Sequence, residues 1–207
     1  MIKHLKLVKL LVVRVYPLSK KLRLVVFASG NGSNFEAIQE AIIQEELNAE
    51  ILALVSNKKD AYAHTRAEKH GIPSYAFFNK EKDLYESEIL GLLETLEFDY
   101  IVCAGYMKII GPVLLNAYTG KIINIHPSNL PLYKGLNALE QALDAGDLEI
   151  GVSVHYVDET LDGGAIIKQV LFPIEESYSK DKIETILHQH EHKLYVEVLK
   201  ELGEKRR

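Results

Sequence analysis

The feature that most constrains this chain is an ordered alternation of apolar, strand-like segments with amphipathic, helix-like segments. Residues 22–28 (LRLVVFA) are apolar and rich in β-branched side chains, with almost no polar alternation. This pattern is typical of a strand buried on both faces of a parallel sheet, which needs helices on either side. The next segment supplies a helix, because Phe35, Ile38, Ala41 and Ile42 follow a turn at helical spacing.

The same unit recurs along most of the chain. Further strands are predicted at residues 51–55, 75–78, 100–103, 121–125, 151–157 and 165–172, and helices at 62–70, 83–96, 112–118, 137–145 and 180–202. In the helix at 83–96 we expect Leu84, Ile89, Leu92 and Leu93 to form the buried stripe. The order predicts an α/β protein with an open, mostly parallel, twisted sheet covered by helices on both faces.

Composition narrows the classes of partner and compartment. The 24 basic and 29 acidic residues give a net charge of −5, which argues against nucleic acid as a partner. A single cysteine, Cys103, allows no internal disulfide, so we expect a cytoplasmic protein. All apolar runs are shorter than the roughly 18 residues that a membrane span needs, so no membrane is expected as a partner.

The first 21 residues differ from the rest of the chain. Residues 1–23 contain seven basic and no acidic side chains, whereas the chain from residue 24 onward carries 17 basic and 29 acidic ones, a net charge of −12. We interpret residues 1–21 as a basic extension and residues 22–207 as one domain. The extension could be a targeting peptide, an added edge strand, or the result of a start assigned too early, with translation beginning near Leu18. We expect the last of these.

A glycine-rich segment, residues 30–34 (GNGSN), joins the first strand to the first helix. Backbone N–H groups and the helix dipole favour an anion at such a junction. The segment does not match a dinucleotide fingerprint, because Phe35 occupies the position of the third glycine and the second strand is followed by residues 56–58 (SNK), without an acid. A phosphate monoester is one interpretation; a plain turn in which Ser33 or Asn34 caps the helix is the other.

Polar side chains also mark a later strand end and a late turn. Asn124 and His126 lie two positions apart, so both project to one side at the carboxyl edge of the sheet, where open α/β sheets bind ligands. An imidazole can transfer protons at neutral pH, and an amide can stabilise an oxyanion. Asp162, in the turn DGG, would favour the imidazolium of a nearby His126. Ordinary structural roles for all three residues are the alternative.

Two other catalytic interpretations fail. His188, His190 and His192 cannot all converge on one ion from a single helix, and no cysteine set or HExxH pattern accompanies them, so no metal site is predicted. The serines show no G-x-S-x-G pattern of a nucleophile elbow.

Five segments occur in order in the chain: VVFASGNGSNFEAI, SNKKDAYAHTRAEKHGI, AGYMKIIGP, INIHPSNLP and SVHYVDETLDGG. Together they closely resemble the folate-dependent phosphoribosylglycinamide formyltransferases of purine synthesis, over residues 22 to about 199. The resemblance implies a formyltransferase fold with a Rossmann-like N-terminal half. It also implies transfer of a formyl group from 10-formyltetrahydrofolate, the co-substrate, to the glycinamide amine of 5′-phosphoribosylglycinamide. Both expected partners are thus small molecules.

The resemblance also assigns roles by position. It implies that Asn124, His126 and Asp162 are catalytic, with direct attack of the substrate amine on the formyl carbon and no covalent enzyme intermediate. The implied phosphoribosylglycinamide-binding residues are Gly32, Ser33, Asn34 and Glu191. The implied folate-binding residues are Lys82, Met107, Lys108, Ile109, Ile110 and, again, Asn124.

Four positions depart from the usual pattern of this family. Lys82 and Lys108 stand where many relatives have arginine, so the folate glutamate tail loses a bidentate partner. Asn137 and Leu139 stand where many relatives have histidine, so a supporting hydrogen-bond network is expected to be missing.

The sequence also disfavours four other functions. A formyltetrahydrofolate hydrolase and a methionyl-tRNA formyltransferase share the catalytic residues, but each normally carries a further domain that 207 residues do not accommodate. A non-catalytic folate-binding relative is disfavoured because all three catalytic positions are filled. An NAD-dependent oxidoreductase is disfavoured by the missing glycine and acid.

Overall fold

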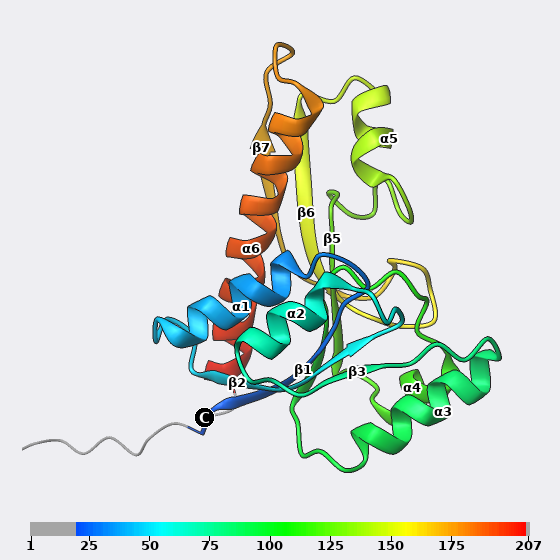
Figure 1. Cartoon of the computed structure of the whole chain (residues 1–207). Helices are drawn as coiled ribbons and strands as arrows, with labels where there is room; N and C mark the ends of the chain where they lie inside the picture. Colours follow the sequence, from blue (N-terminus) through cyan, green and yellow to red (C-terminus); the bar gives the residue numbers. More distant parts are fainter. Residues whose placement is uncertain (1–19, 206–207) are drawn as a thin grey trace, which may run out of the picture.

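The computed structural model of the chain describes residues 20–205 (Figure 1). Its strands are β1 Leu22–Phe27, β2 Ala49–Ser56, β3 Ser74–Ala76, β4 Tyr100–Cys103, β5 Ile122–His126, β6 Glu149–Tyr156 and β7 Ile166–Pro173. Its helices are α1 Ser33–Ile43, α2 Tyr62–Lys69, α3 Lys82–Leu93, α4 Pro112–Ala117, α5 Ala138–Asp144 and α6 Lys180–Glu204. The predicted extension, residues 1–21, lies outside this range except for its last two residues, so the proposed domain division stays a prediction.

The strands form one sheet in the order β3-β2-β1-β4-β5-β6-β7. The pairs from β3 to β5 are parallel, whereas β5–β6 and β6–β7 are antiparallel. β1 lies at the centre of the parallel part, where Val25 is in register with Ala53 of β2 and Ile101 of β4. The mostly parallel α/β sheet predicted from the sequence is confirmed.

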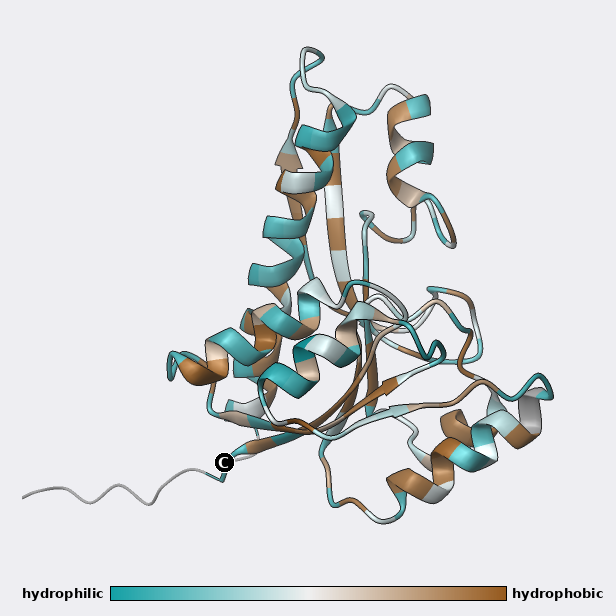
Figure 2. Cartoon of the chain, viewed as in Figure 1, coloured by the Kyte–Doolittle hydropathy of each residue, from teal (hydrophilic) through white to brown (hydrophobic). Residues whose placement is uncertain are grey.

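Helices cover both faces of the sheet, and each face has its own apolar core. Side chains of α1, α2 and α6 pack on one face, with Phe35, Ile38 and Leu194 fully buried or nearly so. Side chains of α3 and α4 pack on the other, around Ile89 and Leu114. The central strands are mostly hydrophobic along their length, whereas the helices alternate hydrophilic and hydrophobic residues (Figure 2). The unbroken apolar runs of the central strands follow from this burial on two sides.

The predicted buried stripe of α3 is partly wrong. Leu84 is 51% exposed, and the stripe instead runs through Tyr85, Ile89 and Leu93, which are spaced four residues apart. The sequence offers two apolar stripes on neighbouring faces of this helix. The stripe with Tyr85 is the buried one because its ring joins the core and its hydroxyl hydrogen-bonds that of Tyr106.

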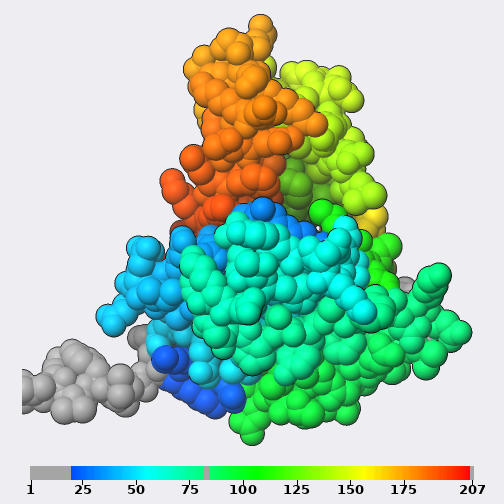
Figure 3. All heavy atoms as spheres, viewed as in Figure 1, coloured from blue at the N-terminus to red at the C-terminus, as the bar shows by residue number. Residues whose placement is uncertain are grey.

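The topology determines where a site can form. β1, β4 and β5 are parallel neighbours, so their carboxyl ends meet at one edge of the sheet and the loops after them lie close together. In the space-filling view, α5, β6, β7 and the first part of α6 rise above the body formed by the first half of the chain (Figure 3). Among the helices of residues 20–205, none is long and apolar enough to cross a membrane.

Candidate active site

His126 is the last residue of β5, and its side chain is buried. Its Nε2 donates a hydrogen bond to the backbone oxygen of Tyr133 at 2.8 Å, because a carbonyl can only accept. Its Nδ1 lies 3.5 Å from Oδ2 of Asp162. Both ring nitrogens therefore face oxygen atoms, one of a backbone carbonyl and one of a carboxylate.

Asp162 comes to His126 from the turn between β6 and β7. Its backbone φ is 45°, and its Oδ2 accepts a hydrogen bond from the backbone nitrogen of Gly135 at 2.8 Å. The turn is close-fitting, since a Cβ on Gly164 would lie 1.9 Å from the backbone oxygen of Tyr156. Gly164 thus allows the turn to pack closely against β6. This packing places the carboxylate of Asp162 near the end of β5.

A second histidine belongs to this cluster and was not predicted. His155 of β6 pairs in register with Asn124, and its Nε2 accepts a hydrogen bond from Nδ2 of Asn124 at 3.2 Å. Its Nδ1 donates to the backbone oxygen of Tyr156 at 2.8 Å. Burial lowers the pKa of His155, which favours the neutral tautomer that orients the amide of Asn124. Predicting the role of His155 requires knowing that β5 and β6 pair antiparallel with Asn124 opposite His155.

Serine hydroxyls hold the loop after β5 in place by hydrogen bonds. Ser153 of β6 donates to the backbone oxygen of Ser128 at 2.6 Å and accepts from the backbone nitrogen of Leu130 at 3.1 Å. Ser128 in turn donates to the backbone oxygen of Leu132 at 2.6 Å. These bonds fix the loop that carries the Tyr133 carbonyl, the acceptor for His126.

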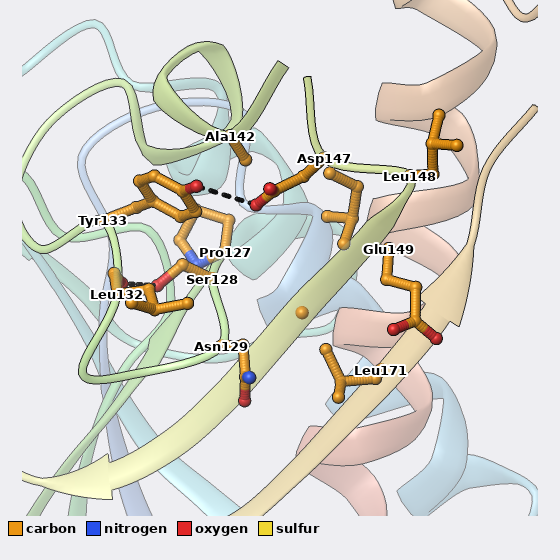
Figure 4. A pocket seen from close by; sticks show the side chains of 12 residues that line it. Pro127, Ser128, Asn129, Leu132, Tyr133, Ala142, Asp147, Leu148, Glu149 and Leu171 are labelled. Carbon is orange, nitrogen blue, oxygen red and sulfur yellow. Dashed lines mark hydrogen bonds between the residues drawn. The ribbon is translucent and has the colours of Figure 1, made fainter. Parts of the chain in front are cut away.

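A cavity of about 340 Å³ lies between this loop and the strands β6 and β7 (Figure 4). Across it, the hydroxyl of Tyr133 donates to Oδ2 of Asp147 at 2.8 Å. None of Asn124, His126 and Asp162 lines this cavity. Tyr133 therefore connects two features: its carbonyl meets the catalytic candidate His126, and its side chain reaches across the cavity.

The glycine-rich loop leads directly into α1. Gly32 is the residue before the helix, with φ 74° and no side chain capping the first turn, so the alternative in which Ser33 or Asn34 caps the helix is wrong. A Cβ on Gly32 would lie 2.8 Å from Cβ of Ala63 in α2, so this position needs glycine for both conformation and space. The N–H groups of the first turn remain for an anion.

Asn34 and Glu191 meet beside this loop. Nδ2 of Asn34 donates to Oε2 of Glu191 at 3.2 Å, and Oδ1 of Asn34 is buried without a hydrogen-bond partner. Glu191 is only 6% exposed and also accepts from Nδ1 of His188 at 2.9 Å. That hydrogen bond raises the pKa of His188. Of the four residues predicted to bind phosphoribosylglycinamide, Gly32, Ser33 and Asn34 follow one another at the start of α1, and Asn34 joins them to Glu191 of α6.

Two of the histidines of α6 have different partners. His188 bonds Glu191, whereas the ring of His190 stacks on Phe172 with centroids 4.1 Å apart. Within residues 20–205 no group of three or more possible ligands is arranged to hold a metal ion.

The predicted folate-binding segment is the loop between β4 and α4. Met107 and Ile109 are each 68% exposed, whereas Ile110 is buried. Nζ of Lys108 lies 3.1 Å from the ring centroid of Tyr85. The backbone nitrogen of Met107 donates to Oγ of Ser29 at 2.7 Å, which joins this loop to the start of the glycine-rich segment. Lys82 is the first residue of α3.

Two buried residues near this loop, Glu86 and Cys103, have no direct part in the proposed chemistry. The buried carboxylate of Glu86 accepts hydrogen bonds from the backbone nitrogens of Gly111 and Val113, which fixes the start of α4. Burial raises the pKa of Cys103 to about 12, so its thiol stays protonated.

The two departures at the start of α5 also have a structural explanation. Asn137 precedes α5 with φ 57°, a conformation that asparagine tolerates better than most residues. Leu139 is 5% exposed and belongs to the apolar core. A histidine there would be buried among apolar side chains.

Fold and site together define a formyl transferase. The family model for formyl transferase matches residues 22–199, and the chain belongs to this family. The phosphoribosylglycinamide formyltransferase of Bacillus subtilis is 46% identical over 183 residues, which are 87% of this chain and 94% of that protein. The crystal structure of phosphoribosylglycinamide formyltransferase from Bacillus halodurans superposes with a TM-score of 0.86 at 40% identity, covering 89% of this chain and 97% of the other.

One further structure bears on the choice among activities. A formyltetrahydrofolate deformylase from Pseudomonas syringae superposes with a TM-score of 0.84 at 29% identity, covering 91% of this chain but only 63% of that chain. The hydrolase thus shares the fold and includes a further region.

Proposed function

We infer that this chain is a phosphoribosylglycinamide formyltransferase, which transfers the formyl group of 10-formyltetrahydrofolate to the amine of 5′-phosphoribosylglycinamide in purine synthesis. A His–Asp pair at a strand end shares one edge of the sheet with a glycine-rich helix start that suits a phosphate. A cytoplasmic location is part of the proposal, supported by the single buried cysteine.

The phosphorylated substrate fits the α1 side of the site. We assign its phosphate to Gly32, Ser33 and Asn34, where first-turn N–H groups and the helix dipole favour an anion. Glu191, buried beside Asn34, is assigned to N–H groups at the glycinamide end. The unpartnered Oδ1 of Asn34 supports binding here, because a buried polar atom without a partner is rare in folded proteins.

The folate co-substrate fits the loop between β4 and α4. Met107 and Ile109 present apolar side chains at the surface of this loop, which suits a flat heterocycle. Lys108 and Lys82 are assigned to the anionic glutamate tail. Ammonium groups attract that tail without the paired geometry of arginine.

The proposed reaction is a direct transfer between two nitrogens. The substrate amine attacks the formyl carbon, the new C–N bond forms, and the carbonyl electrons move to oxygen. Asn124, oriented by His155, and His126 stabilise this oxyanion. Nε2 of His126 is committed to Tyr133, so its Nδ1, 3.5 Å from Asp162, is the nitrogen that donates. The electron pair on oxygen then re-forms the C=O bond as the bond to the folate nitrogen breaks, and the proton lost by the amine passes to that leaving nitrogen by way of water held at Asp162.

A formyl-transfer assay tests this function. Purified protein is given 10-formyltetrahydrofolate with and without phosphoribosylglycinamide, and tetrahydrofolate release is followed. We expect release only with the glycinamide substrate, and loss of at least about 10²-fold in His126→Ala. His64→Gln, at a partly exposed histidine of α2, is the matched control and should keep wild-type activity. Release without the glycinamide substrate would instead identify a hydrolase, and no release a binding protein.

A further inference from the structure

The first turn of α2 lies against the glycine-rich loop and holds it by several contacts. The backbone nitrogen of Ala63 donates to the backbone oxygen of Gly30 at 3.1 Å. Arg66, one turn further along α2, donates from Nε to the backbone oxygen of Asn31 and from Nη2 to Oδ1 of the same residue, both at 2.9 Å. The loop is therefore fixed from α2 as well as from its own two ends.

The guanidinium geometry matters for these contacts. Nε–H and Nη2–H of arginine lie side by side in one rigid plane, so they can bind two acceptors of one residue at once. By binding the carbonyl and the side chain of Asn31 together, Arg66 fixes the orientation of the peptide that precedes Gly32. A lysine at this position could satisfy only part of this arrangement.

Arg66 is itself held in place by α1. Its Nη1 lies 3.4 Å from Oε2 of Glu36, a buried carboxylate whose other oxygen accepts from Lys69 at 2.8 Å and from His70 at 3.1 Å. Burial opposes ionisation of Glu36, but the hydrogen bonds from Lys69 and His70 lower its pKa on balance. Arg66 and Lys69 thus place two positive charges against one carboxylate beside the loop.

We propose that Arg66 is a positioning residue for the phosphate-binding loop and that it determines the preference for the phosphorylated substrate over its unphosphorylated form. Backbone N–H groups bind a phosphate well only if they are already oriented, since ordering them on binding reduces affinity. Arg66 provides that orientation through Asn31, and its charge adds a favourable field for a dianion. The proposal rests on the proposed function, which supplies the phosphorylated substrate.

The test compares Arg66→Gln with wild type on two substrates, phosphoribosylglycinamide and the same glycinamide riboside without phosphate. We expect KM for the phosphorylated substrate to rise about tenfold or more, with kcat changed much less. The kinetics of the unphosphorylated substrate and KM for the folate should change less than twofold. Arg66→Lys should fail to restore KM, because it keeps the charge without the planar pair of donors.

Two further variants separate orientation from charge. Lys69→Gln removes a cation from Glu36 without touching Asn31, so KM should stay within twofold of wild type. Asn31→Ala should raise KM as Arg66→Gln does. The double variant should be no worse than either single one, because both remove the same contact.

Three outcomes would overturn the proposal. They are an Arg66→Gln enzyme with KM within twofold of wild type, equal losses on both substrates, and full recovery in Arg66→Lys. Calorimetry with ribose 5-phosphate on wild type and Arg66→Gln keeps the two hypotheses distinct. If wild type shows no formyl transfer, the proposed function fails. The positioning role of Arg66 is then still tested by calorimetry: it requires that Arg66→Gln bind ribose 5-phosphate about tenfold more weakly than wild type. Thermal melting checks that the variant is folded.

Discussion

His126 and His155 lie near the same carboxylate, but their hydrogen bonds differ. His126 has an oxygen acceptor at each ring nitrogen, the Tyr133 carbonyl at 2.8 Å and Asp162 at 3.5 Å. His155 faces a similar pair of oxygens, the Tyr156 carbonyl at 2.8 Å and Asp162 at 3.6 Å, but its Nε2 also accepts a hydrogen bond from Asn124, and burial lowers its pKa. In the proposed mechanism His126 is therefore the proton donor, whereas His155 orients the amide of Asn124.

Asp162→Asn tests whether the charge at Asp162 is what His126 requires. Asparagine keeps an acceptor for the Gly135 N–H, so the loop should stay in place while the carboxylate is lost. We expect kcat/KM to fall about 10²-fold with little change in KM for either substrate. Asp158→Asn, which removes an exposed carboxylate from the same turn, is the control and should stay within about twofold. A loss below tenfold in Asp162→Asn would contradict the assigned role.

Tyr133→Phe tests the connection across the cavity. The variant removes the hydrogen bond to Asp147 but keeps the ring and the carbonyl that His126 uses. We expect a loss of about 1 kcal/mol in the free energy of unfolding and a fall in kcat of about fivefold, since the carbonyl is held less well. Urea unfolding and steady-state kinetics measure the two effects. A stability loss with unchanged kcat would limit Tyr133 to a structural role.

At the scale of elements, the site is made where strands stop and helices start. β5 ends at His126, β4 leads into the loop with Met107, and α1 begins at Ser33. Strands present side chains at their ends and helices present free N–H groups at their N-termini, so the proposed catalytic and phosphate-binding groups come from different elements.

Gly32→Ala tests the helix start. The methyl group would lie 2.8 Å from Cβ of Ala63 at a residue with φ 74°, so both sterics and backbone conformation oppose it. We expect a loss of about 1–3 kcal/mol in the free energy of unfolding and a rise in KM for phosphoribosylglycinamide. Gly30→Ala is the matched stability control, because a Cβ there has no neighbour within 4 Å. Equal unfolding midpoints for the two variants would show that the close packing of the loop on α2 is not required.

At the scale of the whole molecule, the sequence predicted the order of elements and the type of sheet because both follow from local periodicity. It also placed Asn124 and His126 at a strand end, since period two and strand length are local properties. It did not predict His155, the contacts of Arg66 or the exposure of Leu84. Each of these depends on which elements become neighbours and in what register, and a single sequence does not contain that directly.

The histidines together predict how stability changes with pH. Burial lowers the pKa of His155, His190 and His192, so the unfolded chain takes up protons near pH 6.5 that the folded chain resists. Their contribution to the free energy of unfolding therefore declines as pH falls through 6.5. His188 has the opposite sign. Its pKa is raised by Glu191, so its contribution is full below pH 6.5 and is lost as pH rises through its folded-state pKa.

Urea unfolding at pH 7.5 and pH 5.5 tests these signs. The three histidines with lowered pKa values outweigh His188, whose pKa is raised but whose side chain is half exposed and screened by solvent. Wild type should therefore be less stable at pH 5.5 than at pH 7.5. His155→Gln should make this decline shallower, because it removes a group that resists protonation. His188→Gln should make the decline steeper, because it removes the one group among the four that gains stability from its proton. The two variants should change the pH dependence in opposite directions. If both changed it in the same direction, burial would not explain the pKa of His155, or Glu191 would not explain the pKa of His188.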